Sequence, residues 1–157
     1  MTDQIPIDEL IMRAILAGFG GIRVENGYNS DLGEHVFEWR EEAVPETLLP
    51  CINFQDTKQG TFIAAQEHEH TMTVEGELLL GSKETSLQKI EPPQMLRLML
   101  ADITKCLGAN LTWGGLAEDT TVPSEDSIVM LHQGKKLVGA KFSFQVTYLT
   151  EPFNPYQ

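Results

Sequence analysis

The chain of 157 residues is long enough for one domain with a substantial buried core, and its 41% apolar residues exclude a wholly disordered protein. Acidic residues outnumber basic residues by 23 to 11, and the net charge of −12 argues against a surface that grips nucleic acid. The sequence has no apolar run near the ~18 to 20 residues of a membrane span. Its acidic start, "MTDQIPIDEL", does not have the pattern of a secretory signal.

The negative charge is uneven along the chain. Residues 1–93 contain 17 acidic and 6 basic residues, whereas residues 94–157 contain 6 and 5. Solubility explains such an excess, and so does an acidic face that repels DNA passing nearby. The two cysteines, Cys51 and Cys106, are too few for a disulfide framework and form no CxxC pair, so we expect two reduced thiols in the core.

The first predicted element is a helix over residues 6–18. Pro6 suits the first helical position, and Asp8 and Glu9 lie near the positive end of the helix dipole. The apolar residues of this helix share one face: Ile7, Leu10, Ile11, Ala14 and Gly18. Residues 25–34 follow with turn-forming residues throughout, so they predict a loop.

Three strands are predicted next. Residues 35–41 alternate, with His35, Phe37 and Trp39 on one side, which indicates a half-buried strand, and residues 51–56 predict a second. The third strand covers residues 67–80. Its apolar face carries two histidines as well: His68, His70, Met72, Val74, Leu78 and Leu80. A polar connection over residues 81–92 follows.

The second half of the chain predicts a helix over 93–107, stopped by Gly108, and a loop over 112–126. Residues 127–132 and 135–149 then predict an antiparallel hairpin that turns at Gln133-Gly134. Its second strand alternates clearly between buried and exposed positions, and its inward residues are Phe142, Phe144, Val146 and Tyr148. The tail, residues 150–157, contains two prolines and cannot extend the sheet far. This order predicts a single α+β domain: a mostly antiparallel sheet with two α-helices packed on one face.

The strand segment "EHEH" raises the question of a metal site. His68 and His70 are two residues apart on a strand, so both imidazoles point the same way and could bind one zinc ion. His35 or Glu67 could supply a third ligand. Against this, the pair shares the apolar face of the strand, and such short spacings are common by chance, so an ordinary strand start is the favoured interpretation.

Other catalytic patterns are weaker. "GFGG" follows a helix and not a strand, which argues against a dinucleotide loop, and the chain has no GxSxG motif. Cys51 could be a nucleophile but lies in a strand-like segment, and Asp102 is expected to form a helix-edge hydrogen bond to the sheet. Trp113, with Gly114 and Gly115 behind it, could stack on a ligand or seal the edge of the sheet.

Five segments together resemble one protein family across nearly the full chain. They are "GYNSDLGEHVFEWREEAVPETLLPCINFQD", "HTMTVEGEL", "MLRLMLADITKCLG", "LTWGGLAEDT" and "AKFSFQVTYLTEPFNPY". Their order, after a short amphipathic opening helix, resembles the tail terminator (minor tail protein U-like) family of long-tailed bacteriophages and prophages.

This resemblance implies a structural protein of the virion, without catalysis, cofactor or bound metal. Such a protein forms a homohexameric ring on the head-proximal end of the tail tube, stops tube polymerisation and presents a surface for joining the head. Its partners would be other copies of itself, the major tail-tube protein and a head-completion or connector protein. DNA would pass through the ring without specific binding, and the protein would be in the host cytoplasm during assembly.

Two alternatives remain open: a head–tail connector or adaptor protein, and a small zinc-dependent enzyme that uses His68 and His70. For the terminator, we expect loop 112–126 and tail 150–157 to be mobile in the free subunit and ordered in the ring. Their apolar side chains are the predicted contacts with other subunits or the tail tube: Trp113, Leu116, Phe153 and Tyr156. Alternatively, these side chains cap the subunit's own sheet.

Overall fold

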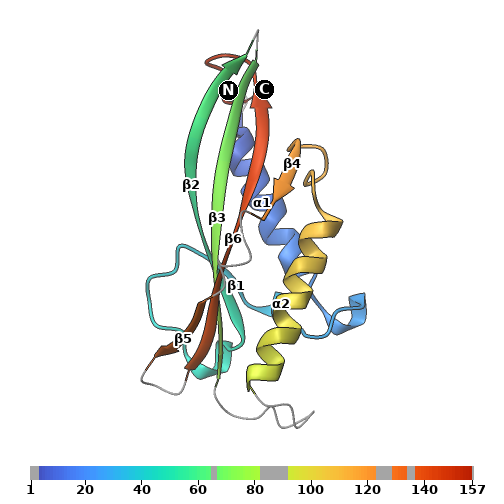
Figure 1. Cartoon of the computed structure of the whole chain (residues 1–157), viewed down its shortest axis with the longest axis vertical. Coiled ribbons are helices and arrows are strands. Elements are labelled where there is room, and N and C mark those ends of the chain that lie inside the picture. The colour runs from blue at the N-terminus through green and yellow to red at the C-terminus, as the bar shows by residue number, and fades with distance from the viewer. Residues whose placement is uncertain (1–3, 65–66, 82–91, 123–128, 134–136, 157) are drawn as a thin grey trace.

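Two layers make up the protein, a twisted six-stranded sheet and a pair of helices that lie on the same face of that sheet (Figure 1). The helices are α1 (Ile7–Gly20) and α2 (Pro92–Ala109), close to the two that the sequence predicts. This computed structural model describes residues 4–64, 67–81, 92–122, 129–133 and 137–156. The described residues form one α+β domain with a mostly antiparallel sheet, which confirms the predicted fold class.

Three long strands dominate the sheet. The strands are β1 (Val36–Glu38), β2 (Cys51–Ala64), β3 (Glu67–Gly81), β4 (Asp119–Thr121), β5 (Val129–Gln133) and β6 (Leu137–Thr150). Their order is β1-β2-β3-β6-β4, with β5 also paired to β6. β1 runs parallel to β2, and every other pairing is antiparallel.

The strand lengths differ from the sequence-based expectation at three places. β2 continues to Ala64, well beyond the predicted 51–56, because its polar second half pairs with β3 along its whole length. β1 is shorter than the predicted 35–41, and β4 lies within the predicted loop 112–126. Neither the extension of β2 nor β4 has an apolar alternation, so only strand pairing reveals them. Residues 82–91, 123–126 and Gly134, on which other predictions fall, lie outside the described residues.

The core lies between the sheet and the helices, and its centre is Phe19 of α1. The Phe19 ring is 4.8 Å from that of Phe54 in an edge-to-face contact and 6.1 Å from that of Phe144 between centroids. The predicted inward faces of β3 and β6 are confirmed. Their buried residues are Met72, Val74, Leu78, Leu80, Phe142, Phe144, Val146 and Tyr148. Gly76 shares this face, and a Cβ there would lie 2.2 Å from the Phe142 ring, so the ring lies directly over the β3 backbone.

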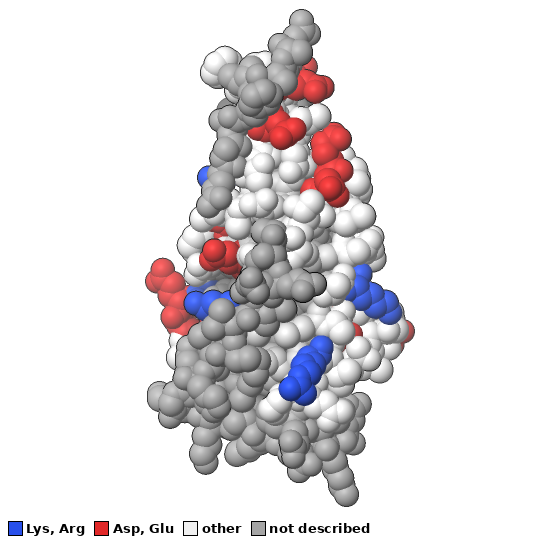
Figure 2. All heavy atoms as spheres, in the orientation of Figure 1, with Lys and Arg blue, Asp and Glu red and all other residues white. Residues whose placement is uncertain are grey.

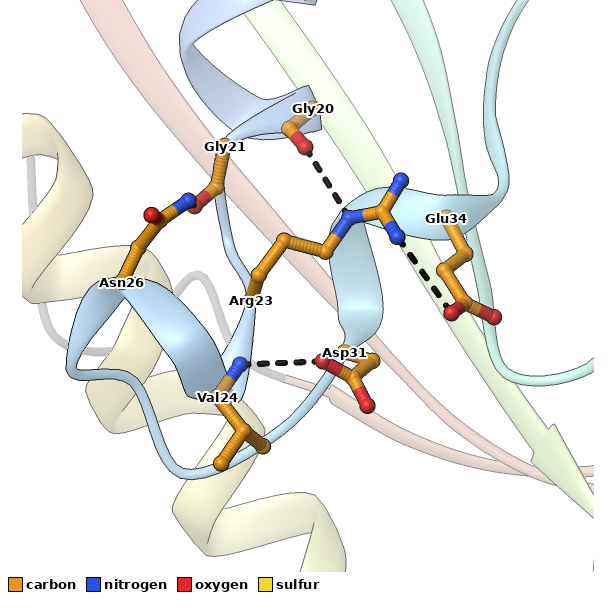
Figure 3. A network of polar contacts seen from close by, with 7 residues as sticks. All are labelled: Gly20, Gly21, Arg23, Val24, Asn26, Asp31 and Glu34. Carbon is orange, nitrogen blue, oxygen red and sulfur yellow. Dashed lines mark hydrogen bonds and ion pairs between the residues drawn. The ribbon is translucent and has the colours of Figure 1, made fainter.

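The segment after α1 folds back onto the end of that helix (Figure 3). Arg23 donates from Nε to the Gly20 carbonyl at 3.4 Å and from its guanidinium to Glu34 at 3.3 Å. The Asp31 carboxylate accepts the Val24 N–H at 2.9 Å. Two short 3-10 helices, Val24–Asn26 and Leu32–Glu34, replace the featureless loop that the sequence predicts. These contacts give the segment a fixed shape against the helical layer. None of the helices in the described ranges is long and apolar enough to cross a bilayer.

Candidate functional site

The two histidines of β3 pack against aromatic side chains. Their ring centroids are 5.7 Å apart. His70 stacks on Tyr148 at 4.8 Å, and its Nε2 is 2.8 Å from the Thr150 hydroxyl. His68 contacts the Phe153 ring edge-on at 5.5 Å. The pair therefore lies where the end of β6 and the C-terminal tail meet β3.

The third ligands that the sequence offered for zinc do not join this pair. His35 precedes β1 and lies near the opposite end of β3 from the histidine pair. Its carbonyl accepts the N–H of Ile52, and Ile52 is paired with Leu78 of β3. Leu78 is separated from His68 along β3 by about 30 Å at ~3.3 Å per residue. Glu67 lies on the opposite face of β3 from His68, since strand side chains alternate. Among the residues that the structure describes, no three His, Cys, Asp or Glu side chains are placed to hold a metal ion.

Electrostatics around the histidine pair favour a neutral imidazole at His70. Burial lowers the pKa of His70, and His68 and Lys58 lower it further, whereas Asp8 opposes them. Lys58 reaches this site from β2 and forms an ion pair with Asp8 of α1. The site thus joins the N-terminal turn of α1 to the sheet through paired charges and stacked rings.

The C-terminal tail is tied to α1 by its backbone. The Pro155 carbonyl accepts the N–H of Ile7 at 2.9 Å, which satisfies one of the amides that a helix start leaves without an internal partner. The side chains of the tail behave differently. Phe153 is 92% exposed with φ at +61°, a left-handed conformation that disfavours bulky residues, and Tyr156 is 41% exposed.

Trp113 lies in the core, although the sequence groups it with the tail aromatics. Its side chain is 3% exposed and stacks against Phe19 and Phe144. The indole N–H donates to the Thr120 hydroxyl at 2.9 Å, and Leu116 packs nearby against the same core. Trp113 therefore seals the subunit's own sheet, which is the alternative that the sequence left open, and it offers no stacking face to a ligand.

Cys51 and Cys106 are both fully buried, as expected for core thiols. Burial raises the pKa of each thiol to about 11, so the nucleophilic thiolate is disfavoured at neutral pH. Asp102 is 1% exposed, but the prediction that it bonds to the sheet is wrong. Its carboxylate accepts the Asn29 N–H at 2.9 Å, the Asn29 amide at 3.0 Å and the Ser30 hydroxyl at 2.7 Å. Asp102 therefore anchors the loop before β1 to α2.

Comparison of the sequence with protein-family models and with curated proteins gives no match. The functional argument for this chain therefore depends on the resemblance noted from its sequence and on its own geometry. That geometry gives more weight to exposed aromatic surfaces than to the histidine pair, since the histidines are packed against residues of their own subunit.

The sequence reasoning missed one surface residue, Trp39. It was expected within a half-buried strand, on the same side as His35 and Phe37, but β1 ends at Glu38 and Trp39 has φ at +53°. The left-handed turn moves its side chain outward, where it is 51% exposed and its indole N–H donates to Asp56 at 3.0 Å. The acidic segment "EWREEAVPE" around it, which has no apolar alternation, is the sequence signal that could have indicated an exposed loop.

On the sheet face away from the helices there is a shallow hollow of about 440 Å³. It crosses the middle of β2, β3 and β6. Its lining residues are Asn53, Gln55, Glu75, Gly76, Glu77, Lys141, Phe142 and Ser143. Two carboxylates and one ammonium group in an open hollow form no nucleophile–base pair, so this surface suggests no particular reaction.

Proposed function

We propose that the protein is a bacteriophage tail terminator, or a closely related tail-completion protein, that assembles into a ring on the head-proximal end of the tail tube. The ring stops tube polymerisation and provides the surface to which the head joins. Support comes from the resemblance along nearly the full chain and from the α+β fold with both helices on one face. The side chains that would make contacts are those of the tail.

The observation that carries the proposal is the conformation of Phe153. In the free subunit the Phe153 ring contacts the edge of His68 yet is 92% exposed on a left-handed backbone, and exposure and backbone conformation both cost free energy. The tail around it is nevertheless held in place by the bond from Ile7 to Pro155. A fixed backbone that presents a large aromatic ring is an arrangement suited to an anchor in a protein interface.

The charge of the chain fits the same role. A net charge of −12 per subunit makes a ring that does not adhere to DNA, because adhesion requires lysine and arginine to neutralise phosphates. In this proposal the histidine pair has a structural role and not a catalytic one. His70 holds the end of β6 through Thr150, and His68 supports Phe153 from below.

Deleting the gene from the phage or prophage that carries it tests the proposal. We expect tails of abnormal, uncontrolled length by electron microscopy, and restoration of normal length when the wild-type gene is supplied. Tails of normal length that stay detached from heads would instead assign the protein to the head–tail connectors. Infectious particles with normal tails would overturn both assignments.

A complementing gene with Phe153→Ala and Tyr156→Ala tests separately whether the exposed aromatic side chains of the tail make the contact. We expect this variant to fold and to fail in length control. The matched control replaces an exposed, non-aromatic side chain of the same tail, Glu151→Ala, and should restore normal tails. If the aromatic variant also restores them, the tail does not make the contact.

A further inference from the structure

An acidic loop and a basic helix surface lie on opposite flanks of the molecule. The loop between β1 and β2 lies on the left flank in Figure 1 and α2 lies on the right. In the same orientation, Figure 2 shows acidic side chains beside a basic one on the left flank, further acidic side chains over the upper part of the molecule, and basic side chains over the region of α2. We call residues 38–46 the acidic loop and the exposed side of α2 the basic face.

The acidic loop combines excess negative charge with an exposed aromatic ring. Glu38, Glu41 and Glu42 are exposed, and partial burial together with Glu9 and Asp56 raises the pKa of Glu38. Arg40, the basic residue of this loop, makes its contacts within the subunit. Its guanidinium lies 4.7 Å from the centroid of the Phe37 ring and donates to main-chain carbonyls of the loop.

Trp39 is held in position at the centre of this loop. Its N–H donates to the Phe54 carbonyl at 2.8 Å, and its indole N–H donates to Asp56 at 3.0 Å, yet the side chain remains 51% exposed. The left-handed φ of +53° places the ring outside the core. Trp39 therefore has the same combination of fixed backbone, unfavourable φ and exposed ring as Phe153.

The basic face is the counterpart of this loop in both charge and shape. Arg97 and Lys105 are exposed on α2, and the Lys105 ammonium also donates to the Gly27 carbonyl at 2.8 Å and lies 4.9 Å from the centroid of the Tyr28 ring. The acid of this helix, Asp102, is buried and bonded to residues 29 and 30. Between the two bases lies the exposed Ala101, one helical turn from each. The small side chain leaves a low surface beside Arg97 against which an indole ring can lie.

We propose that the acidic loop of one copy docks on the basic face of α2 of the next copy, with Trp39 as the aromatic anchor of the contact. The inference rests on the proposed function, because a closed ring needs two different complementary patches on each subunit. Surfaces on opposite flanks provide a head-to-tail contact of this kind. Opposite charge fixes the orientation and accelerates encounter, and the tryptophan supplies the apolar contact.

Two variants remove one surface each. The loop variant carries Trp39→Ala, Glu41→Gln and Glu42→Gln, and the helix variant carries Arg97→Glu and Ala101→Glu. Lys141→Glu, on the sheet face away from the helices, is the charge control. Native mass spectrometry and sedimentation velocity, from micromolar to near-millimolar protein in low salt, report the oligomers. Circular dichroism confirms that each variant is folded.

We expect wild type and the control to self-associate, more weakly at high salt, and each surface variant alone to lose at least tenfold in association constant. An equal mixture of the two variants should form a one-to-one dimer and nothing larger, because each such pair retains a single intact contact. Variants that associate like wild type, a mixture that stays monomeric, or a mixture that forms longer oligomers would overturn the inference.

The proposed function and this contact fail in different ways. A wild-type protein that is monomeric at every concentration contradicts the contact, while tail lengths after gene deletion still decide the function. If the mixture of variants forms a dimer but gene deletion leaves normal tails, the contact between copies is supported and the proposed tail function is wrong.

Discussion

The two ends of the helical layer hold their loops in different ways. At the α2 junction, which comprises Asp102, Trp113 and the loops they hold, buried polar atoms are hydrogen-bonded and the indole lies in the core. At the tail end, which comprises the histidine pair and residues 151–156, one backbone bond holds the tail to α1 and an aromatic ring faces solvent. The first arrangement stabilises the subunit, whereas the second leaves most of the Phe153 ring exposed to solvent despite its edge contact with His68.

Backbone conformation makes the difference clear. Trp113 and Phe153 both have a positive φ, at +48° and +61°. The unfavourable conformation at Trp113 is offset within the subunit by stacking against Phe19 and by the bond to Thr120. No comparable contact buries Phe153 in the described part of the chain, so an interface with another protein is the place where its conformation would be compensated.

The largest difference between the two ends should come from removing the two aromatic rings. We expect Trp113→Ala to lower the free energy of unfolding by about 3 to 5 kcal/mol, as for other buried aromatic residues. Phe153→Ala should change it by less than about 0.5 kcal/mol, because the ring is already in solvent. Urea denaturation followed by circular dichroism measures both. Equal losses in the two variants would contradict the division into a buried and an exposed aromatic group.

Asp102→Ala tests the polar half of the α2 junction. The substitution leaves three donors from Asn29 and Ser30 without their acceptor, which should cost about 2 to 3 kcal/mol. Hydrogen exchange should show lost protection at the Asn29 amide. Thr104→Ala, on the exposed side of the same helix, is the control and should stay within about 0.5 kcal/mol of wild type. An Asp102 variant as stable as the control would show that the anchor is dispensable.

A smaller effect is expected at the tail end when the pH falls. Burial first, and then His68 and Lys58, lower the pKa of His70, so the unfolded chain binds a proton at this residue more readily than the native protein does. Its contribution is therefore present above the usual histidine pKa and is lost as the pH falls below it. The stability advantage of wild type over His70→Gln should shrink between about pH 8 and about pH 5. A constant difference across this range would exclude the predicted linkage.

Truncation after Thr150 should have the smallest effect on the fold. It removes the Pro155 acceptor of the Ile7 amide, which costs about 0.5 to 1.5 kcal/mol for one hydrogen bond, and an amide at a helix start can bond to water instead. Thermal unfolding should therefore remain cooperative, while length control of tails should be lost. A truncated protein that still controls tail length would remove the tail from the interface.

The sequence was most informative where burial follows a local period. The alternation from Phe142 to Tyr148 identifies the core-facing side of β6, because one face of a half-buried strand must be buried. The stripe predicted for residues 6–18 is offset, since Ile11 is its one buried member and α1 instead buries Met12, Ile15 and Phe19. The same periodicity placed the histidine pair on the inward face of β3. Fold class and the orientation of both long central strands followed from these patterns.

Contacts between distant segments were decided only by the tertiary structure. The polar half of β2 is a strand because β3 lies beside it, and Asp102 bonds to Asn29 because α2 passes that loop. Local composition could not separate Trp113 from Phe153, since both lie in segments predicted as loop or tail, outside the predicted helices and strands. Their opposite environments depend on which side chains the fold brings alongside, and a single sequence does not record such long-range packing in its periodicity. For the same reason Trp39, expected within a strand, lies on the surface beyond the end of β1.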